Sequence, residues 1–138
     1  MRYLERRPEH PHGLCGSAAE LIPDPNEVLV WAEQVMAQLD PGRPYALRLE
    51  PDGLYTGYHV WLDLGGSASG SLFALPEPPE QALARLADQL QEHVLETTHG
   101  RPVPVCPGHR HPAVADVVNG TAVWRCMDSP ALVVRPIL

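Results

Sequence analysis

Residues Cys106 to Cys126 read CPGHRHPAVADVVNGTAVWRC and contain two of the three cysteines and two of the seven histidines of the chain. Asn119-Gly120 separates two runs of β-prone residues. This dipeptide favours a two-residue turn of type I′, because both of its positions accept positive φ. The stretch therefore predicts a β-hairpin. In the register of that hairpin Cys126 lies opposite Ala113. His111 is then the diagonal neighbour of Cys126 across the strands, with about 7–8 Å between the two backbone positions.

The ends of this hairpin carry residue types that bind zinc. Cys106 and His109 flank Pro107-Gly108, a spacing that makes a tight turn and points both side chains at one spot. A tetrahedral ion with Zn–S bonds of about 2.3 Å and Zn–N bonds of about 2.0–2.1 Å is able to join this turn to the diagonal pair. We therefore expect a structural Zn²⁺ in a Cys/His hairpin element over residues 106–128. Its predicted ligands are Cys106, His109, His111 and Cys126.

Two other interpretations of the same residues remain open from the sequence. In the first, Cys126 and Trp124 are core residues of the hairpin face that includes Ala115, and the histidines are solvated without a metal. In the second, Cys106 and Cys126 form a disulfide. The three interpretations differ in where the two sulfur atoms lie and in what surrounds them.

The motif also carries a family resemblance. The segments CPGH, HP and AVWRC resemble the C-terminal element of small actinobacterial proteins that have no assigned activity, in which CPxH and HP precede a short hairpin and AVWxC. The resemblance covers residues 83–126, and it departs at Met127, where those proteins usually have proline. The Cys-Pro-Gly-His turn also resembles half of a degenerate zinc ribbon. Both resemblances imply the Cys/His element, and neither implies an activity.

Composition limits the class of protein. A chain of 138 residues with 44% hydrophobic and 20% charged residues is typical of one globular domain. The net charge is −7, and the ten basic residues, all arginine, are scattered along the chain, which argues against a nucleic-acid partner. We find no apolar run near the ~20 residues of a membrane span and no apolar core of a signal peptide. We therefore expect a cytoplasmic protein, consistent with its odd cysteine count.

Local signals predict the order of helices and strands. Asp24, Pro25 and Glu27 form the start of a helix, with a capping residue, a first-turn proline and a capping-box glutamate. An apolar stripe predicts a second helix over Pro79–Thr97. Alternating residues between about 45 and 75 predict a β-meander. We expect an α+β fold, with two helices packed on an antiparallel β-sheet in α-β-β-β-α order, followed by the Cys/His hairpin.

The N-terminal residues 1–22 are proline-broken and predict an extended arm, whereas residues 23–138 form a single α+β domain. His10, His12 and Cys15 in the arm offer a second metal site or a further ligand for the first. A polar tail with incidental histidines is the simpler interpretation, because no turn chemistry brings these three side chains together.

Enzyme motifs are missing from the sequence. It contains no Gly-rich phosphate loop, no GxSxG and no HExxH. The helix and strand order resembles that of double-stranded RNA-binding domains, but Glu77 and Glu80 at the start of the second helix would repel phosphates. A zinc-dependent hydrolase with an open coordination position is the alternative function. It requires His111 to leave the ion and a nearby general base.

We therefore expect a non-catalytic, zinc-stabilised binding or adaptor protein that docks a protein partner, as an immunity-type protein or as an accessory subunit. The meander face opposite the core supplies the candidate contact surface, since a tryptophan flanked by charges suits partner binding. The alternative is a solvated sheet face whose tryptophan is covered by the N-terminal arm. The predicted partner-binding residues are Arg48, Glu50, His59, Trp61 and Asp63.

Overall fold

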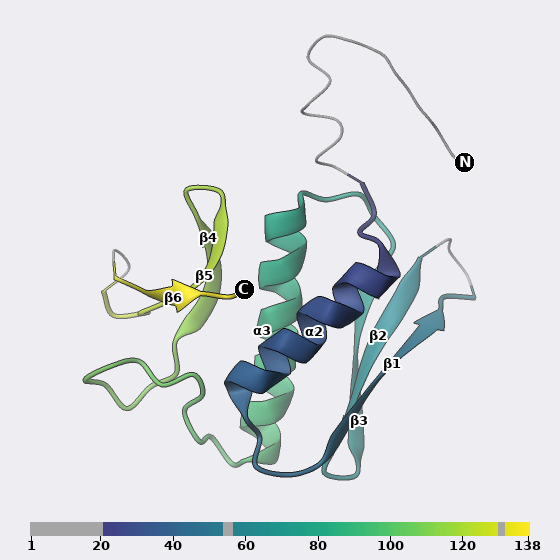
Figure 1. Ribbon diagram of the computed structural model, residues 1–138. Helices are drawn as coiled ribbons and strands as arrows, with labels where there is room; N and C mark the ends of the chain where they lie inside the picture. The colour runs from purple at the N-terminus through teal and green to yellow at the C-terminus, as the bar shows by residue number, and fades with distance from the viewer. Residues whose placement is uncertain (1–20, 54–56, 130–131) are drawn as a thin grey trace, which may run out of the picture.

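The computed structural model describes residues 21–53, 57–129 and 132–138, so His10, His12 and Cys15 lie outside the described residues. The described chain contains two helices and two three-stranded antiparallel sheets, which confirms the predicted α+β class (Figure 1). The elements are α2 (Pro25–Leu39), β1 (Tyr45–Pro51), β2 (Tyr58–Leu64), β3 (Ser67–Phe73), α3 (Pro79–Thr97), β4 (Val114–Val118), β5 (Thr121–Arg125) and β6 (Val133–Pro136).

Helix α2 begins and ends with specific caps. The carboxylate of Asp24 accepts hydrogen bonds from the backbone N–H groups of Asn26 at 2.8 Å and Glu27 at 3.4 Å, as the sequence predicts. The helix ends at Asp40, which adopts a left-handed conformation with φ 44° and donates its N–H to the Met36 carbonyl. One face of the helix is buried, and its residues are Val28, Trp31, Ala32, Val35, Met36 and Leu39.

The first sheet has strand order β1-β2-β3. Side chains alternate along the central strand β2, and its inner face, made of Tyr58, Val60, Leu62 and Leu64, is buried against the helices. The Tyr58 hydroxyl donates a hydrogen bond of 2.7 Å to the Pro23 carbonyl. This bond ties the start of the sheet to the segment that leads into α2.

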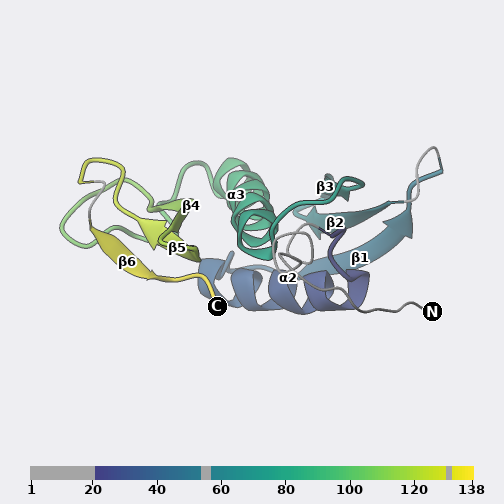
Figure 2. The same ribbon diagram turned by 90° about the horizontal axis from the view of Figure 1, so that it is seen from above.

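Helix α3 lies between the two sheets, and α2 runs across it (Figures 1 and 2). The buried side of α3 is therefore wider than a single stripe and includes Ala82, Leu83, Ala84, Leu86, Ala87, Leu90, Gln91, His93 and Val94. Residues of both helices and both sheets belong to one hydrophobic core. Neither described helix combines the length and the apolar character needed to cross a bilayer.

The second sheet has strand order β4-β5-β6 and covers the side of α3 that faces away from the first sheet. Asn119 and Gly120 form its tight turn with φ values of 52° and 77°, and Val118 pairs with Thr121. The predicted hairpin register is confirmed. A last edge strand near Leu132–Val134 is predicted by the sequence, but not the sheet that it joins; β6 extends the hairpin into a separate sheet.

Polar side chains of α3 bind the backbone of this second sheet and of the segment that leads into it. The Gln91 side-chain amide donates to the carbonyls of Val103 at 3.1 Å and Ala113 at 2.6 Å. The Glu80 carboxylate accepts a hydrogen bond of 2.6 Å from the Ala122 N–H. The attachment of β4 and β5 to the helix is therefore partly polar and directional.

Gln38 of α2 makes a similar connection to β5 and the C-terminal segment. Its side-chain oxygen accepts a hydrogen bond of 2.8 Å from the indole N–H of Trp124, which is fully buried. Its amide nitrogen donates to the Ile137 carbonyl. One side chain thus fixes the orientation of a core tryptophan and the path of the chain after β6.

Candidate metal centre

The structure brings the four predicted zinc ligands together. Cys106, His109, His111 and Cys126 each offer one ligand atom, and these four atoms lie within 4.8 Å of one another. His109 Nδ1 is 3.3 Å from the Cys106 sulfur and 3.4 Å from the Cys126 sulfur. The bond lengths of a tetrahedral zinc site imply about 3.5 Å between a sulfur and a nitrogen ligand. The donor set and its spacing therefore fit one small tetrahedral ion.

Local backbone structure explains this convergence. The His109 N–H donates to the Cys106 carbonyl at 3.0 Å, which closes the turn, and Gly108 supplies the positive φ of 79° that the turn requires. The Cys106 N–H donates to the His111 carbonyl at 3.3 Å. Cys126 reaches the same place from the end of β5. A turn and a hairpin that meet thus build the cluster.

His111 offers one ring nitrogen to the cluster. Its Nδ1 lies 3.2 Å from the Pro112 carbonyl, a contact that favours a proton on Nδ1. Its buried Nε2 has no hydrogen-bond partner among the described residues. An Asp128 carboxylate oxygen is 3.0 Å away, within ion-pair distance but outside hydrogen-bond geometry. The contact with Pro112, opposed by desolvation and supported by the charge of Asp128, raises the pKa of His111.

The two thiols differ in their acidity. Burial, with the hydrogen bond and negative charge of Cys126, raises the pKa of Cys106 to about 11. Burial acts in the same direction on Cys126, but hydrogen bonds with Cys106, the backbone at Ser129 and Asp128, and the His109 ring outweigh it and lower its pKa to about 7. At neutral pH the pair therefore shares a proton, which a metal ion would displace on binding.

Burial indicates what the cluster is able to do. Both cysteines have 0% exposure, and His111 is half-buried. Four protein donors complete a tetrahedral shell, whereas a catalytic zinc keeps a position for water or substrate. The two cysteines are free thiols, so the structure has no Cys106–Cys126 disulfide. The arrangement suits an ion that joins the turn to the hairpin.

The predicted partner-binding residues lie together on the outer face of the first sheet. Arg48 pairs across the strands with Trp61, and Glu50 pairs with His59. The Arg48 guanidinium donates to an Asp63 oxygen at 3.0 Å and also forms an ion pair with Glu50. The charges on this face are thus largely matched to one another.

Trp61 is the centre of this face. The Arg48 guanidinium lies 5.3 Å from the centroid of its ring, and the His59 ring stacks on it with centroids 5.6 Å apart. Gly70 on β3 provides the space for the indole, because a Cβ at that position would lie 2.9 Å from a ring carbon. Several neighbours therefore fix the orientation of the tryptophan.

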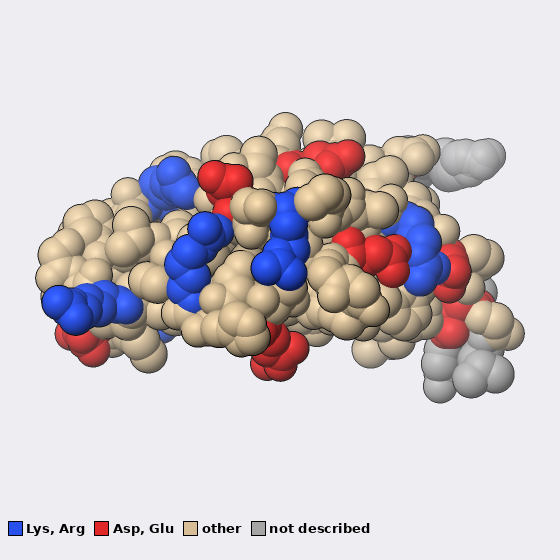
Figure 3. Space-filling view, turned by 90° about the horizontal axis from the view of Figure 1, so that it is seen from below, with Lys and Arg blue, Asp and Glu red and all other residues tan. Residues whose placement is uncertain are grey.

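Charges of both signs are mixed on the surface. On the face drawn in Figure 3, both arginine and acidic side chains are exposed. A clustered cationic surface is what phosphate-backbone binding requires. The absence of a nucleic-acid partner therefore stays a prediction from the composition of the chain.

Comparisons with known proteins add no family assignment. The chain matches no protein-family model, no curated protein and no solved structure. The resemblance to small actinobacterial proteins stays a prediction, and function has to be argued from the geometry of the chain.

Proposed function

We propose that this protein is a non-catalytic binding module that is stabilised by a structural zinc ion and docks a protein partner. The observation that carries the proposal is the convergence of four ligand atoms within 4.8 Å of one another at the junction of the turn and the hairpin. Two thiols in a reducing compartment stay available to a metal, which agrees with a cytoplasmic location.

The chemistry of the donors supports zinc. Thiolate and neutral imidazole ligands in a Cys2His2 set suit Zn²⁺, whereas Ca²⁺ and Mg²⁺ prefer oxygen ligands. The Nδ1 of His111 contacts a backbone carbonyl, as one ring nitrogen of a metal-bound histidine usually does. Asp128 lies at the edge of the cluster and adds negative charge near the ion.

The four-donor shell supports a structural role over hydrolysis. A hydrolytic zinc needs an open coordination position and a general base that reaches the attacking water. In this chain Asp128 is the acidic group beside the cluster, and it faces the fourth ligand, His111. A catalytic role would require His111 to leave a position in which a backbone contact holds it.

A matched pair of histidine variants tests the zinc. His109→Asn removes a ligand, whereas His99→Asn changes an exposed histidine with φ 59°, a conformation that asparagine tolerates. We expect wild type and His99→Asn to contain about one zinc per chain and His109→Asn to contain none. Elemental analysis after purification without added metal measures this, and metal-free wild type would contradict the proposal.

The outer face of the first sheet is the contact surface that we propose for the partner. An aromatic side chain with a fixed orientation loses little conformational entropy on binding, and arginine and tryptophan are common at the centres of interfaces. The acidic net charge favours a partner with a basic surface. An immunity-type protein that covers a basic active site and an accessory subunit of a larger assembly are the two forms of this proposal.

The partner surface is tested by affinity capture from cells that express the protein, with Trp61→Ala beside Val30→Ala. Val30 is a half-exposed apolar residue on α2, so its truncation changes surface hydrophobicity away from this face. We expect one captured protein to be lost with Trp61→Ala and kept with Val30→Ala. Equal capture by both variants would remove the sheet face from the proposal.

A further inference from the structure

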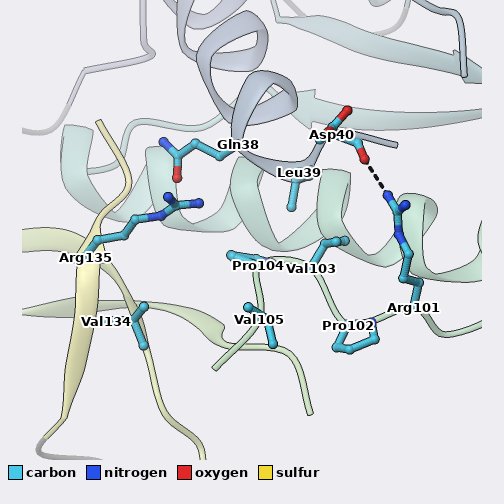
Figure 4. Close-up of a pocket in the computed structure, with 10 residues that line it drawn as sticks. All are labelled: Gln38, Leu39, Asp40, Arg101, Pro102, Val103, Pro104, Val105, Val134 and Arg135. Atoms are coloured by element: carbon cyan, nitrogen blue, oxygen red, sulfur yellow. Dashed lines mark hydrogen bonds between the residues drawn. The ribbon is translucent and has the colours of Figure 1, made fainter. Parts of the chain in front are cut away.

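A pocket of 460 Å³ lies on another part of the molecule, where the end of α2, residues 101–105 and β6 meet (Figure 4). Its accessible apolar walls come from Pro102, Val103, Val105 and Val134, which lie over the buried Leu39 and Pro104. None of the four candidate zinc ligands lines it, and it does not include the outer face of the first sheet. The pocket is therefore separate from the Cys/His cluster and from the outer face of the first sheet.

Two arginines give this pocket its charge. Arg101 and Arg135 lie at opposite sides of it in Figure 4. Arg101 donates to the backbone carbonyl of Asp40, and it shares no ion pair with a carboxylate of the described residues. Arg135 likewise has no carboxylate within ion-pair distance in the described part of the chain. By contrast, Arg48, Arg85 and Arg125 each pair with an acidic side chain.

The wall between the two guanidinium groups is fixed. Gln38 lines the pocket, and its side chain is held at both ends, by the indole N–H of Trp124 and by the Ile137 carbonyl. Leu39 and Pro104 are buried beneath the surface. A ligand that enters the pocket therefore meets a preformed apolar wall between two cationic groups with unused N–H donors.

We propose that this pocket binds a carboxylate attached to a compact apolar group. Guanidinium groups recognise carboxylates through paired N–H donors, and the apolar walls remove the attached group from water. The volume lies within the range of small-molecule sites, about 300–1,000 Å³. A free organic acid and the C-terminal residue of a peptide share this chemistry. The inference depends neither on zinc nor on the Trp61 face.

The test is a titration of ¹⁵N-labelled, full-length protein followed by NMR. The probes are 3-phenylpropanoate, its neutral amide, acetate, and a tripeptide ending in leucine with a free or an amidated C-terminus. Arg135→Gln and Arg101→Gln each remove one guanidinium. Arg43→Gln is the matched control, because Arg43 is exposed and does not line the pocket.

We expect 3-phenylpropanoate or the free-acid tripeptide to shift amide signals of residues 101–105 and 133–136, with no comparable shift from acetate or from either amide. Arg135→Gln should weaken binding by about 10-fold or more, and Arg43→Gln should leave it within about 2-fold. Binding by the tripeptide alone would identify a peptide as the source of the carboxylate.

Three results would overturn the proposal: no saturable shift with either acid, equal binding of acid and amide, or unchanged affinity in Arg135→Gln. Arg101→Gln also removes the contact with the Asp40 carbonyl. If that variant does not fold, Arg135→Gln decides the question alone, because the Arg135 side chain makes no hydrogen bond within the described chain.

Discussion

The two sheets of this protein are attached to the same helix in different ways. The first sheet has seven-residue strands, and the central strand alternates between buried apolar residues and an outer face made of His59, Trp61 and Asp63. The strands of the second sheet have four or five residues, and every residue of β4 is only half-buried. The second sheet instead donates hydrogen bonds to side-chain oxygens of Gln38 and Glu80, and Gln91 donates to the Ala113 carbonyl just before β4. The sheet ends at the Cys/His cluster.

This difference shows what a short sheet needs. A strand that buries every second side chain gains about 1.5–3 kcal/mol from each large apolar residue, so a seven-residue central strand is stabilised largely by the hydrophobic effect. A four- or five-residue strand has fewer such positions. Directional hydrogen bonds and a metal ion supply specific attachment where apolar area is small. We therefore expect the second sheet to respond to chemical changes that leave the first intact.

The largest expected effect is that of metal removal. Chelation of the proposed zinc should destabilise the second sheet by about 5 kcal/mol or more, because binding and folding of such sites are coupled. Hydrogen exchange followed by NMR would detect loss of protection in β4–β6 while amides in β2 stay protected. Uniform loss in both sheets would contradict the contrast between them, and no change would remove the structural role of the metal.

The next effect in size concerns Gln91. Gln91→Met keeps the length of the side chain but leaves the Val103 and Ala113 carbonyls without their donor, at an expected cost of about 2–4 kcal/mol. Urea unfolding measures this cost. The control is Gln34→Met on the exposed side of α2, which should change stability by less than about 0.5 kcal/mol. Similar costs for both variants would show that the hydrogen bonds of Gln91 contribute little.

A smaller effect is expected in the first sheet from Tyr58→Phe. The variant removes the hydrogen bond to the Pro23 carbonyl and should cost about 1 kcal/mol, because the ring and its stacking on Phe73 remain. Burial, with nearby acidic charges, raises the pKa of Tyr58 to about 12, above the value of 10 for a free phenol. The folded state disfavours the phenolate, so stability falls as pH rises from about 10 to about 12. Tyr58→Phe should have a flatter stability curve in that window.

The smallest expected effect concerns an exposed ion pair on the second sheet. Asp116 accepts a hydrogen bond of 2.6 Å from Arg125, and this contact, with the Val117 N–H, lowers the pKa of Asp116. Its contribution is present above the pKa of an unfolded aspartate and is lost as pH falls through the lower folded value. Asp116→Asn should cost less than about 1 kcal/mol at pH 7, as should Asp63→Asn on the first sheet. A larger loss of unfolding free energy in Asp116→Asn than in Asp63→Asn would show that β4 depends on the Asp116–Arg125 ion pair.

Short-range sequence signals predicted much of this architecture. The cap at Asp24, the helix over Pro79–Thr97 and the turn at Asn119-Gly120 each depend on residues within a few positions, so local chemistry was sufficient. The convergence of Cys126 with Cys106 followed from the hairpin register together with the Pro-Gly turn. The strand pairing within this hairpin could be predicted because the two strands are joined by a two-residue turn.

The placement of the second sheet could not be predicted in the same way. An apolar stripe on α3 indicates burial, but it does not show that two sheets cover opposite sides of the helix. Gln91 was the available signal, because a glutamine beside Leu90 and Val94 lies within a widened buried face. Arg101 and Arg135 are 34 positions apart and gave no motif, since their proximity depends on tertiary packing. The placement of the second sheet and the pocket between the two arginines depend on long-range contacts, which local sequence patterns do not predict.

The position of α3 between the sheets has a consequence for fragments of this chain. A cut in the 74–78 linker would leave the first sheet with α2 but without α3, and a cut at residues 101–105 would separate the second sheet from both helices. For either cut, we therefore expect that neither of the two resulting fragments folds when it is expressed alone. Mixed together, the two halves should recover native structure by complementation, since each exposes the apolar surface that the other covers.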